Sequence, residues 1–312
     1  MRDPRTLPQL TGGRLFITDG GMETTLIFER GLDLPCFASF PLATDDAGRA
    51  MLREYFVPYI TIACKHGTGF VVDAPTWRAN PDWGERLGYD ARALADATRA
   101  SVELAEQMGA TALGEIPVLI NGAIGPRGDG YVAGQLMSAA EAQRYHSVQI
   151  ETLAGTAVDM VTAWTLTYAD EATGIVRAAT EAGVPAAISF TVETNGRLPS
   201  GESLRDAIEQ VDADTDGATA YFMVNCAHPT HFASVIEEDG GWRERIRGIR
   251  ANASRKSHAE LDESDELDSG DPLDLATRYR ALRATLPWMT VVGGCCGTDE
   301  RHVAAICAAL AD

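Results

Sequence analysis

Basic residues are scarce in this sequence relative to acidic ones. Its 312 residues include 26 lysines and arginines against 45 aspartates and glutamates, which gives a formal net charge of −19 at pH 7. Such a charge repels the phosphates of nucleic acids and of anionic lipids. We therefore expect neither nucleic acid nor a membrane surface as a partner, and the sequence holds no signal for an oligomeric state.

Long apolar runs are also lacking. No stretch reaches the roughly 18 apolar residues of a membrane-spanning helix, and residues 1–11 contain no apolar segment typical of a signal peptide. Cysteine is limited to six positions. Together these features predict a soluble cytoplasmic protein whose thiols are buried, reactive or metal-bound rather than joined in disulfides.

A glycine-rich phosphate loop is absent as well. The first apolar run ends in residues 18–23, TDGGME, which do not form the G-x-G-x-x-G pattern of a dinucleotide-binding fold. This absence weakens the alternative of an open, doubly wound sheet with a ligand at its switch point.

Eight short apolar runs alternate along the chain with eight segments of helical periodicity. Within a run, apolar and polar residues do not alternate, and this pattern is typical of parallel strands that are covered on both faces. The expected strands are Leu15–Gly20, Gly69–Pro75, Val118–Gly125, Val158–Trp164, Ala186–Val192, Ala220–His228, Ile246–Ser254 and Met289–Gly297. The expected helices are 46–66, 91–108, 139–155, 169–182, 203–212, 229–237, 272–285 and 299–310. Eight such units predict one domain over residues 1–312, an α/β fold of the (β/α)₈ TIM barrel type with its catalytic face at the carboxyl ends of the strands. A division into two domains is the less favoured alternative.

Three cysteines fall at the ends of two expected strands. Cys226 ends the sixth, and Cys295 and Cys296 lie in a Gly-Gly-Cys-Cys-Gly turn that ends the eighth. These strands are separated by one neighbour in a closed barrel, so their ends converge, and the glycines allow the turn to curl. Three thiolates favour Zn²⁺ and leave its fourth position open. The remaining cysteines are interpreted as packing residues: Cys36, Cys64 and Cys307.

A zinc ion with three thiolate ligands suits thiol chemistry. It keeps a thiol at the open position deprotonated and nucleophilic, so transfer of a methyl group from a sulfonium or ammonium donor to that thiol is the favoured reaction. Two alternatives stay open. One is a zinc hydrolase, although such sites usually have histidine and carboxylate ligands, and the other is a non-catalytic zinc or redox-sensing barrel.

Three motifs at these strand ends resemble the homocysteine S-methyltransferase family. They are residues 19–24 (DGGMET), residues 224–226 (VNC) followed by Pro229, and residues 293–298 (GGCCGT), of which the last is the most specific. The similarity runs from about residue 14 to residue 311.

The resemblance implies a (β/α)₈ barrel with catalytic zinc on Cys226, Cys295 and Cys296, and methyl transfer to homocysteine in methionine biosynthesis. It also implies that Asp19 helps to hold the substrate's ammonium group. S-methylmethionine and S-adenosylmethionine are the favoured donors, followed by betaine, because the chain leaves no room for the folate and corrinoid modules of the large methionine synthases. Methylation of a different thiol is the alternative.

One position departs from the family. The family commonly ends strand four in Glu-Thr, whose glutamate is a second partner for the ammonium, whereas this sequence has Trp164 and Thr165 there. Three explanations stay open: Glu193 substitutes, the acceptor is another thiol, or the ammonium contacts Trp164 by a cation–π interaction. Trp77 is a second aromatic candidate for contact with the donor's cation. The expected substrate-binding residues are Asp19, Gly20, Gly21, Thr24, Asn225, Trp164, Trp77 and Asn252.

Two histidines and an acidic segment are not assigned to the site. His228 and His231 are not assigned as ligands, because three cysteines already complete the zinc pattern. Residues 260–271 hold seven carboxylates without the spacing of an EF-hand. We expect a solvated loop there, with a mobile lid over the catalytic face as the alternative.

Overall fold

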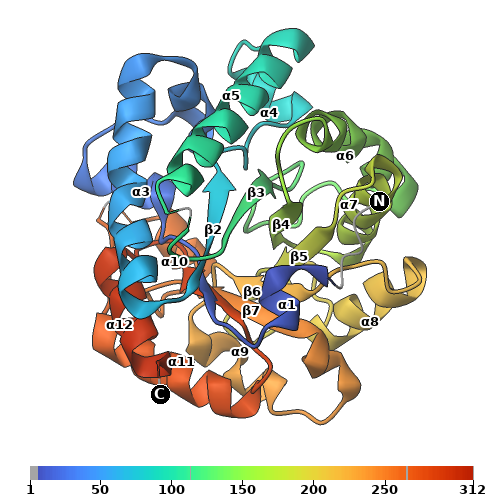
Figure 1. The fold of residues 1–312 in the computed structure, drawn as a ribbon. Coiled ribbons are helices and arrows are strands. Elements are labelled where there is room, and N and C mark those ends of the chain that lie inside the picture. Colours follow the sequence, from blue (N-terminus) through green and yellow to red (C-terminus); the bar gives the residue numbers. More distant parts are fainter. Residues whose placement is uncertain (1–5, 113, 265, 312) are drawn as a thin grey trace.

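A closed barrel of eight parallel strands forms the centre of the computed structural model, which describes residues 6–112, 114–264 and 266–311 (Figure 1). Each strand pairs with its neighbours in sequence, and pairing of Phe16 with Val291 closes the ring. The strands are β1 (Phe16–Ile17), β2 (Gly69–Ala74), β3 (Val118–Ile124), β4 (Met160–Leu166), β5 (Ala186–Phe190), β6 (Phe222–Asn225), β7 (Ile246–Ala251) and β8 (Val291–Gly294). The predicted (β/α)₈ fold is confirmed.

Helices surround the barrel (Figure 1). The long ones are α3 (Asp46–His66), α5 (Ala91–Ala110), α6 (Ala139–Ala154), α7 (Ala169–Ala182), α8 (Leu204–Asp214), α9 (Pro229–Ile236), α11 (Pro272–Thr285) and α12 (Glu300–Leu310). All eight correspond to predicted helices. The sequence did not predict the short helices α1 (Pro8–Thr11), α2 (Met22–Thr24), α4 (Pro81–Arg86) and α10 (His258–Asp262). No described helix is both long and apolar enough to cross a membrane.

The interior of the barrel has an apolar layer and a polar layer. Phe16, Val71, Leu119 and Met160 pack together with Leu7, which immediately precedes α1. Further along the strands the inward positions become polar: the Asn121 amide donates to Asp73 at 2.6 Å, and Thr162 donates to Asn121 at 2.9 Å. Because side chains on a strand alternate between faces, Val71 and Asp73 both point inward, two residues apart. The polar layer therefore lies beneath the carboxyl ends of the strands and forms the floor of any site there.

Candidate functional site at the carboxyl ends of the strands

A cavity that is open to solvent lies at the carboxyl ends of the strands, and its empty space together with the solvent at its mouth amounts to about 990 Å³. All three predicted zinc cysteines line it, as do seven of the eight predicted substrate-binding residues; Asn252 is the exception. This is where catalytic groups of a barrel enzyme are expected. Its charged lining residues are five carboxylates and two guanidinium groups: Asp19, Glu23, Asp73, Asp129, Asp262, Arg78 and Arg250.

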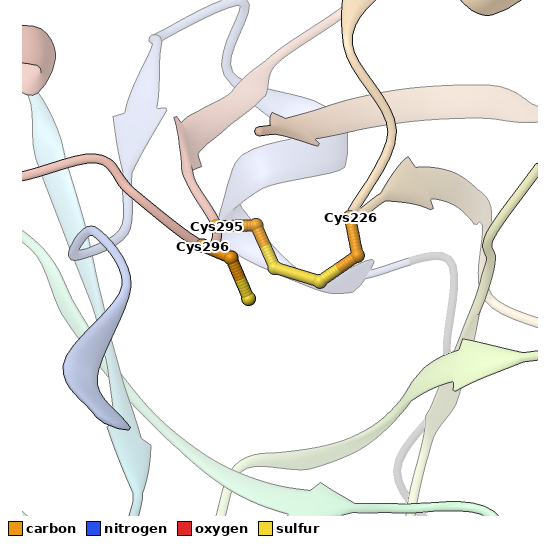
Figure 2. A group of neighbouring side chains, drawn as sticks. All are labelled: Cys226, Cys295 and Cys296. Carbon is orange, nitrogen blue, oxygen red and sulfur yellow. A yellow bond between two sulfur atoms is a disulfide. The ribbon is translucent and has the colours of Figure 1, made fainter. Parts of the chain in front are cut away.

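The three cysteines converge as predicted, but two of them are joined. The sulfur atoms of Cys226, Cys295 and Cys296 lie within 4.8 Å of one another, and a disulfide links Cys226 to Cys295 while Cys296 remains a free thiol (Figure 2). The expectation that no cysteines are bridged is therefore wrong, since convergence of two strand ends brings two sulfur atoms into bonding contact. Cysteine binds a metal ion as the thiolate. This cluster can therefore bind an ion through all three sulfurs only after the disulfide is reduced.

Backbone turns at both strand ends direct the sulfurs to a common point. Cys226 has a φ of 51°, in the left-handed region, so the chain turns sharply where β6 ends. After β8, Gly297 has a φ of 76°, and the hydroxyl of Thr298 donates to the carbonyl of Cys295 at 2.7 Å. These contacts form the curled turn that the glycines predicted, and both adjacent cysteines reach the cavity.

Tyr131 covers the free thiol. Its hydroxyl lies 3.4 Å from the Cys296 sulfur, and its ring stacks on His258 with 4.1 Å between ring centroids. His258 in turn has Nε2 at 2.8 Å from the carbonyl oxygen of Cys226. Burial raises the pKa of Tyr131 well above its ordinary value, so the hydroxyl keeps its proton at neutral pH.

An arginine that the sequence did not mark as a site residue occupies the floor of the cavity. Arg250 on β7 donates from Nη2 to Asp19 at 2.7 Å and from Nη1 to Asp73, and the hydroxyl of Tyr55 donates to the other oxygen of Asp19 at 2.9 Å. Burial opposes the charge of Arg250, yet Asp19 and Asp73 raise its pKa above the ordinary value. Burial raises the pKa of Asp73 to about 6 although Arg250 opposes the shift. Both oxygens of Asp19 thus already have protein partners.

The departure at strand four is linked to this arginine. The guanidinium carbon of Arg250 lies 4.8 Å from the centroid of the Trp164 ring, and Trp77 donates from Nε1 to the Trp164 carbonyl at 3.4 Å. Glu193 does not line the cavity, and its carboxylate lies 3.3 Å from Nδ1 of His258. Of the three explanations for Trp164, substitution by Glu193 therefore has the least structural support.

Several predicted binding residues also hold the strand ends together. A Cβ on Gly20 would lie 2.7 Å from the carbonyl oxygen of Thr298, and one on Gly21 would lie 2.6 Å from that of Cys295. The Thr24 hydroxyl accepts from the Gly297 amide at 3.2 Å. Asn225 accepts from Ser189 at 2.6 Å and from the amide of Thr165 at 3.0 Å, and Asn252 donates to the Cys226 carbonyl at 3.1 Å.

The two histidines after β6 and the acidic segment have structural roles. His228 caps α9 by accepting from the Thr230 amide at 3.3 Å, and Nε2 of His231 lies 3.0 Å from the Arg255 carbonyl oxygen. In the acidic segment, Asp268 accepts from Ser254 at 2.6 Å, whereas residue 265 lies outside the described residues. Asp262 from the same segment reaches the cavity, and the lid remains a prediction.

The cavity-lining side chains that the sequence did not mark as site residues include Glu23, Arg78, Tyr131 and Arg250. One signal was present for Arg250, because a charged side chain that is buried within a strand must be paired. Glu23 accepts from Ser39 at 2.8 Å, and burial raises its pKa. Glu23 lies within the DGGMET motif, and Arg78 directly follows Trp77.

Comparison with known proteins agrees with the sequence motifs. The chain matches the homocysteine S-methyltransferase family over residues 16–310. The metallated form of the homocysteine methyltransferase MmuM from Escherichia coli shares 20% sequence identity and superposes with a TM-score of 0.77, covering 98% of this chain and 99% of that chain. Its oxidised form has the same identity and coverage and a TM-score of 0.78. No curated protein sequence matches the chain. Structural likeness at this identity shows the fold alone, but the family match covers nearly the whole sequence, so the chain belongs to the homocysteine S-methyltransferase family and is a methyltransferase.

Proposed function

We propose that this protein transfers a methyl group from a sulfonium or ammonium donor to the thiol of homocysteine and so forms methionine. S-methylmethionine and S-adenosylmethionine are the favoured donors, and betaine follows. The observation that supports the proposal most directly is the convergence of three cysteine sulfurs within 4.8 Å at a cavity that is rich in carboxylates.

The three cysteines fit a zinc ion when the disulfide is reduced. Cys226, Cys295 and Cys296 supply three soft ligands from two strand ends, which matches the pattern of a catalytic zinc site with one open position. When bound there, zinc supplies a Lewis acid that favours the deprotonated form of a thiol. A cytoplasmic location, which we also propose, would keep these cysteines reduced.

The cavity's own charges favour a cationic donor. Its lining includes five carboxylates against two guanidinium groups, so a positive charge is attracted. In the transfer, a bond between the methyl carbon and the new sulfur forms as the bond to the donor's sulfur or nitrogen breaks. That atom keeps the electron pair and becomes neutral. Desolvated carboxylates and indole rings orient the cation for this attack. We propose that Asp19 faces the acceptor's ammonium through the oxygen lone pairs that Arg250 and Tyr55 leave unused.

The test is a matrix of donors and acceptors with reduced, zinc-loaded protein, in which methylated products are identified by mass spectrometry. Methionine formed from homocysteine and one of the three donors is the expected result. Product with another thiol alone would refute homocysteine as the acceptor. No product with any pair would favour the second candidate, a redox-sensing barrel, for which the Cys226–Cys295 disulfide is the supporting observation.

A further inference from the structure

Arg78 is the second guanidinium group of the cavity and follows directly after Trp77. Its guanidinium carbon lies 3.9 Å from the centroid of the Trp77 ring and 4.0 Å from that of Trp83. The residue is 6% exposed. Burial lowers the pKa of Arg78 to about 10, so it remains a cation at neutral pH, fixed between two indoles.

The hydrogen bonding of this guanidinium is incomplete. Nη1 donates to the carbonyl of Gly128 at 3.0 Å, whereas the buried Nε has no partner. Within the described part of the chain, no carboxylate oxygen lies within the 4.0 Å that defines an ion pair with Arg78. Asp129 and Glu23 attract the guanidinium only from beyond that distance, and a buried charge without a close ion-pair partner calls for a ligand or an ordered group beside it.

The other arginine of the cavity provides an internal comparison. Arg250 donates from Nε to the Gly294 carbonyl at 2.8 Å and from Nη2 to both Asp19 and the carbonyl of Gly20, while Nη1 pairs with Asp73. Its donors are used within the protein. The cationic group with unused donors at this cavity is therefore Arg78.

We propose that Arg78 anchors the carboxylate of a small-molecule substrate in this cavity. Arg78 lines the cavity, and although its Nε is closed to solvent, its Nη2 has no hydrogen-bond partner among the described residues and can donate to a carboxylate oxygen in a charge-assisted hydrogen bond. A polyanion such as a phosphate ester is disfavoured because the same cavity holds five carboxylates. The inference rests on the proposed function and deepens it: the substrate that binds here is a zwitterion, with its carboxylate on Arg78 and its cationic centre toward the acidic residues.

Both substrates of the proposed reaction have this chemistry. Each favoured donor carries a carboxylate near a sulfonium or quaternary ammonium centre, and homocysteine carries one near its ammonium group. The experiment must therefore distinguish the donor from the acceptor. For this purpose we pair each ligand with a carboxylate-free analogue: S-methylmethionine with its carboxamide, betaine with choline, and homocysteine with its decarboxylated analogue.

The experiment measures binding of each ligand by calorimetry to reduced, zinc-loaded protein as wild type, Arg78→Gln and Arg78→Lys. Arg86→Gln is the matched control, because Arg86 stacks on the same Trp83 ring at 4.4 Å but is exposed and does not line the cavity. We expect Arg78→Gln to weaken binding of one carboxylate-bearing ligand by about 10- to 100-fold, the effect of a hydrogen bond to a charged group. It should leave the carboxylate-free analogue unaffected. The affinity of Arg78→Lys should lie between those of wild type and Arg78→Gln. Thermal melting checks that each variant is folded.

Each outcome decides the inference. Selective loss of affinity for S-methylmethionine or betaine shows that Arg78 anchors the methyl donor. Selective loss of affinity for homocysteine shows that it anchors the acceptor. Equal affinities in wild type and Arg78→Gln would overturn the inference, as would a wild type that does not distinguish any ligand from its analogue. Methyl transfer with unchanged KM in Arg78→Gln would refute the anchor while preserving the proposed function. Binding that depends on Arg78 without any methyl transfer would refute the function while preserving the anchor.

Discussion

Replacing Arg250 by methionine should destabilise the protein strongly, because it leaves two buried carboxylates without their cation. Asp19 is 1% exposed and Asp73 is 5% exposed, and both pair with this one guanidinium. Removing one partner of a buried ion pair costs about 3–5 kcal/mol, since the remaining charge is neither solvated nor paired. The assay is urea unfolding of wild type and Arg250→Met in the same reducing, zinc-containing buffer at pH 8.

The loss should also depend on pH. The pKa of Asp73 is already raised to about 6 in the folded protein, and removal of Arg250 raises the pKa values of both carboxyl groups further. A carboxyl whose pKa is higher in the folded than in the unfolded state binds more protons when folded, so its contribution to stability is lost as the pH rises through the folded pKa. The difference between variant and wild type should therefore be smaller at pH 5 than at pH 8.

Two further variants identify the cause. Arg247→Met removes an arginine from the same strand whose Nη1 donates to the Trp288 carbonyl at 3.1 Å, and it should change stability by no more than about 1 kcal/mol. Asp73→Asn in the Arg250→Met background removes one unpaired charge and should restore part of the loss. If Arg250→Met unfolds within about 1 kcal/mol of wild type at pH 8, the buried network does not carry the charge that we assign to it.

Three further predictions concern the metal and the acceptor. Reduced protein should bind about one zinc per chain, measured by elemental analysis, and Cys296→Ser should lose most of it; full retention would contradict the three-cysteine site. Asp19→Asn should keep its zinc but weaken use of the acceptor by about 1.5–3 kcal/mol, measured as kcat/KM, and an unchanged value would place the acceptor elsewhere. Trp164→Glu should leave KM for homocysteine unchanged, because the introduced carboxylate is placed beside Arg250 and pairs with it; a marked fall in KM would show that it reaches the substrate instead.

The helices were predicted well because their signals are local. The helix expected over residues 46–66 has the observed bounds of α3: Asp45 accepts from the Gly48 amide at 2.9 Å at its start, and Gly67 ends it with a φ of 63°. Such caps act within a few residues of the chain. The short helices α4 and α10 lie within loops and lack the length over which helical periodicity becomes visible.

The site was predicted only in part because its decisive contacts are not local. Strand order alone predicts that Cys226 lies near Cys295 and Cys296, because the ends of β6 and β8 converge in a closed barrel. The partners of Arg250 are 231 and 177 positions away in sequence, and their pairing depends on which strand positions face inward at the same height. Likewise, no spacing rule decides which two of three neighbouring sulfurs form a disulfide.

The tryptophan at the end of β4 and the arginine on β7 are best understood as one physical unit. Asp19 and Asp73 already share the charge of Arg250, so a third carboxylate in the place of Trp164 would compete for the same cation. The indole instead lies 4.8 Å from the guanidinium carbon, and Arg250 is 8% exposed, so the low local dielectric constant of this buried place strengthens both ion pairs. Strand four thereby gives the cavity an apolar wall where the family commonly has an acid. If Arg78 anchors a carboxylate as proposed, recognition of that group falls to the segment after β2, where Arg78 has unused donors and Trp77 lines the same cavity, while Asp19 remains the proposed partner of the ammonium.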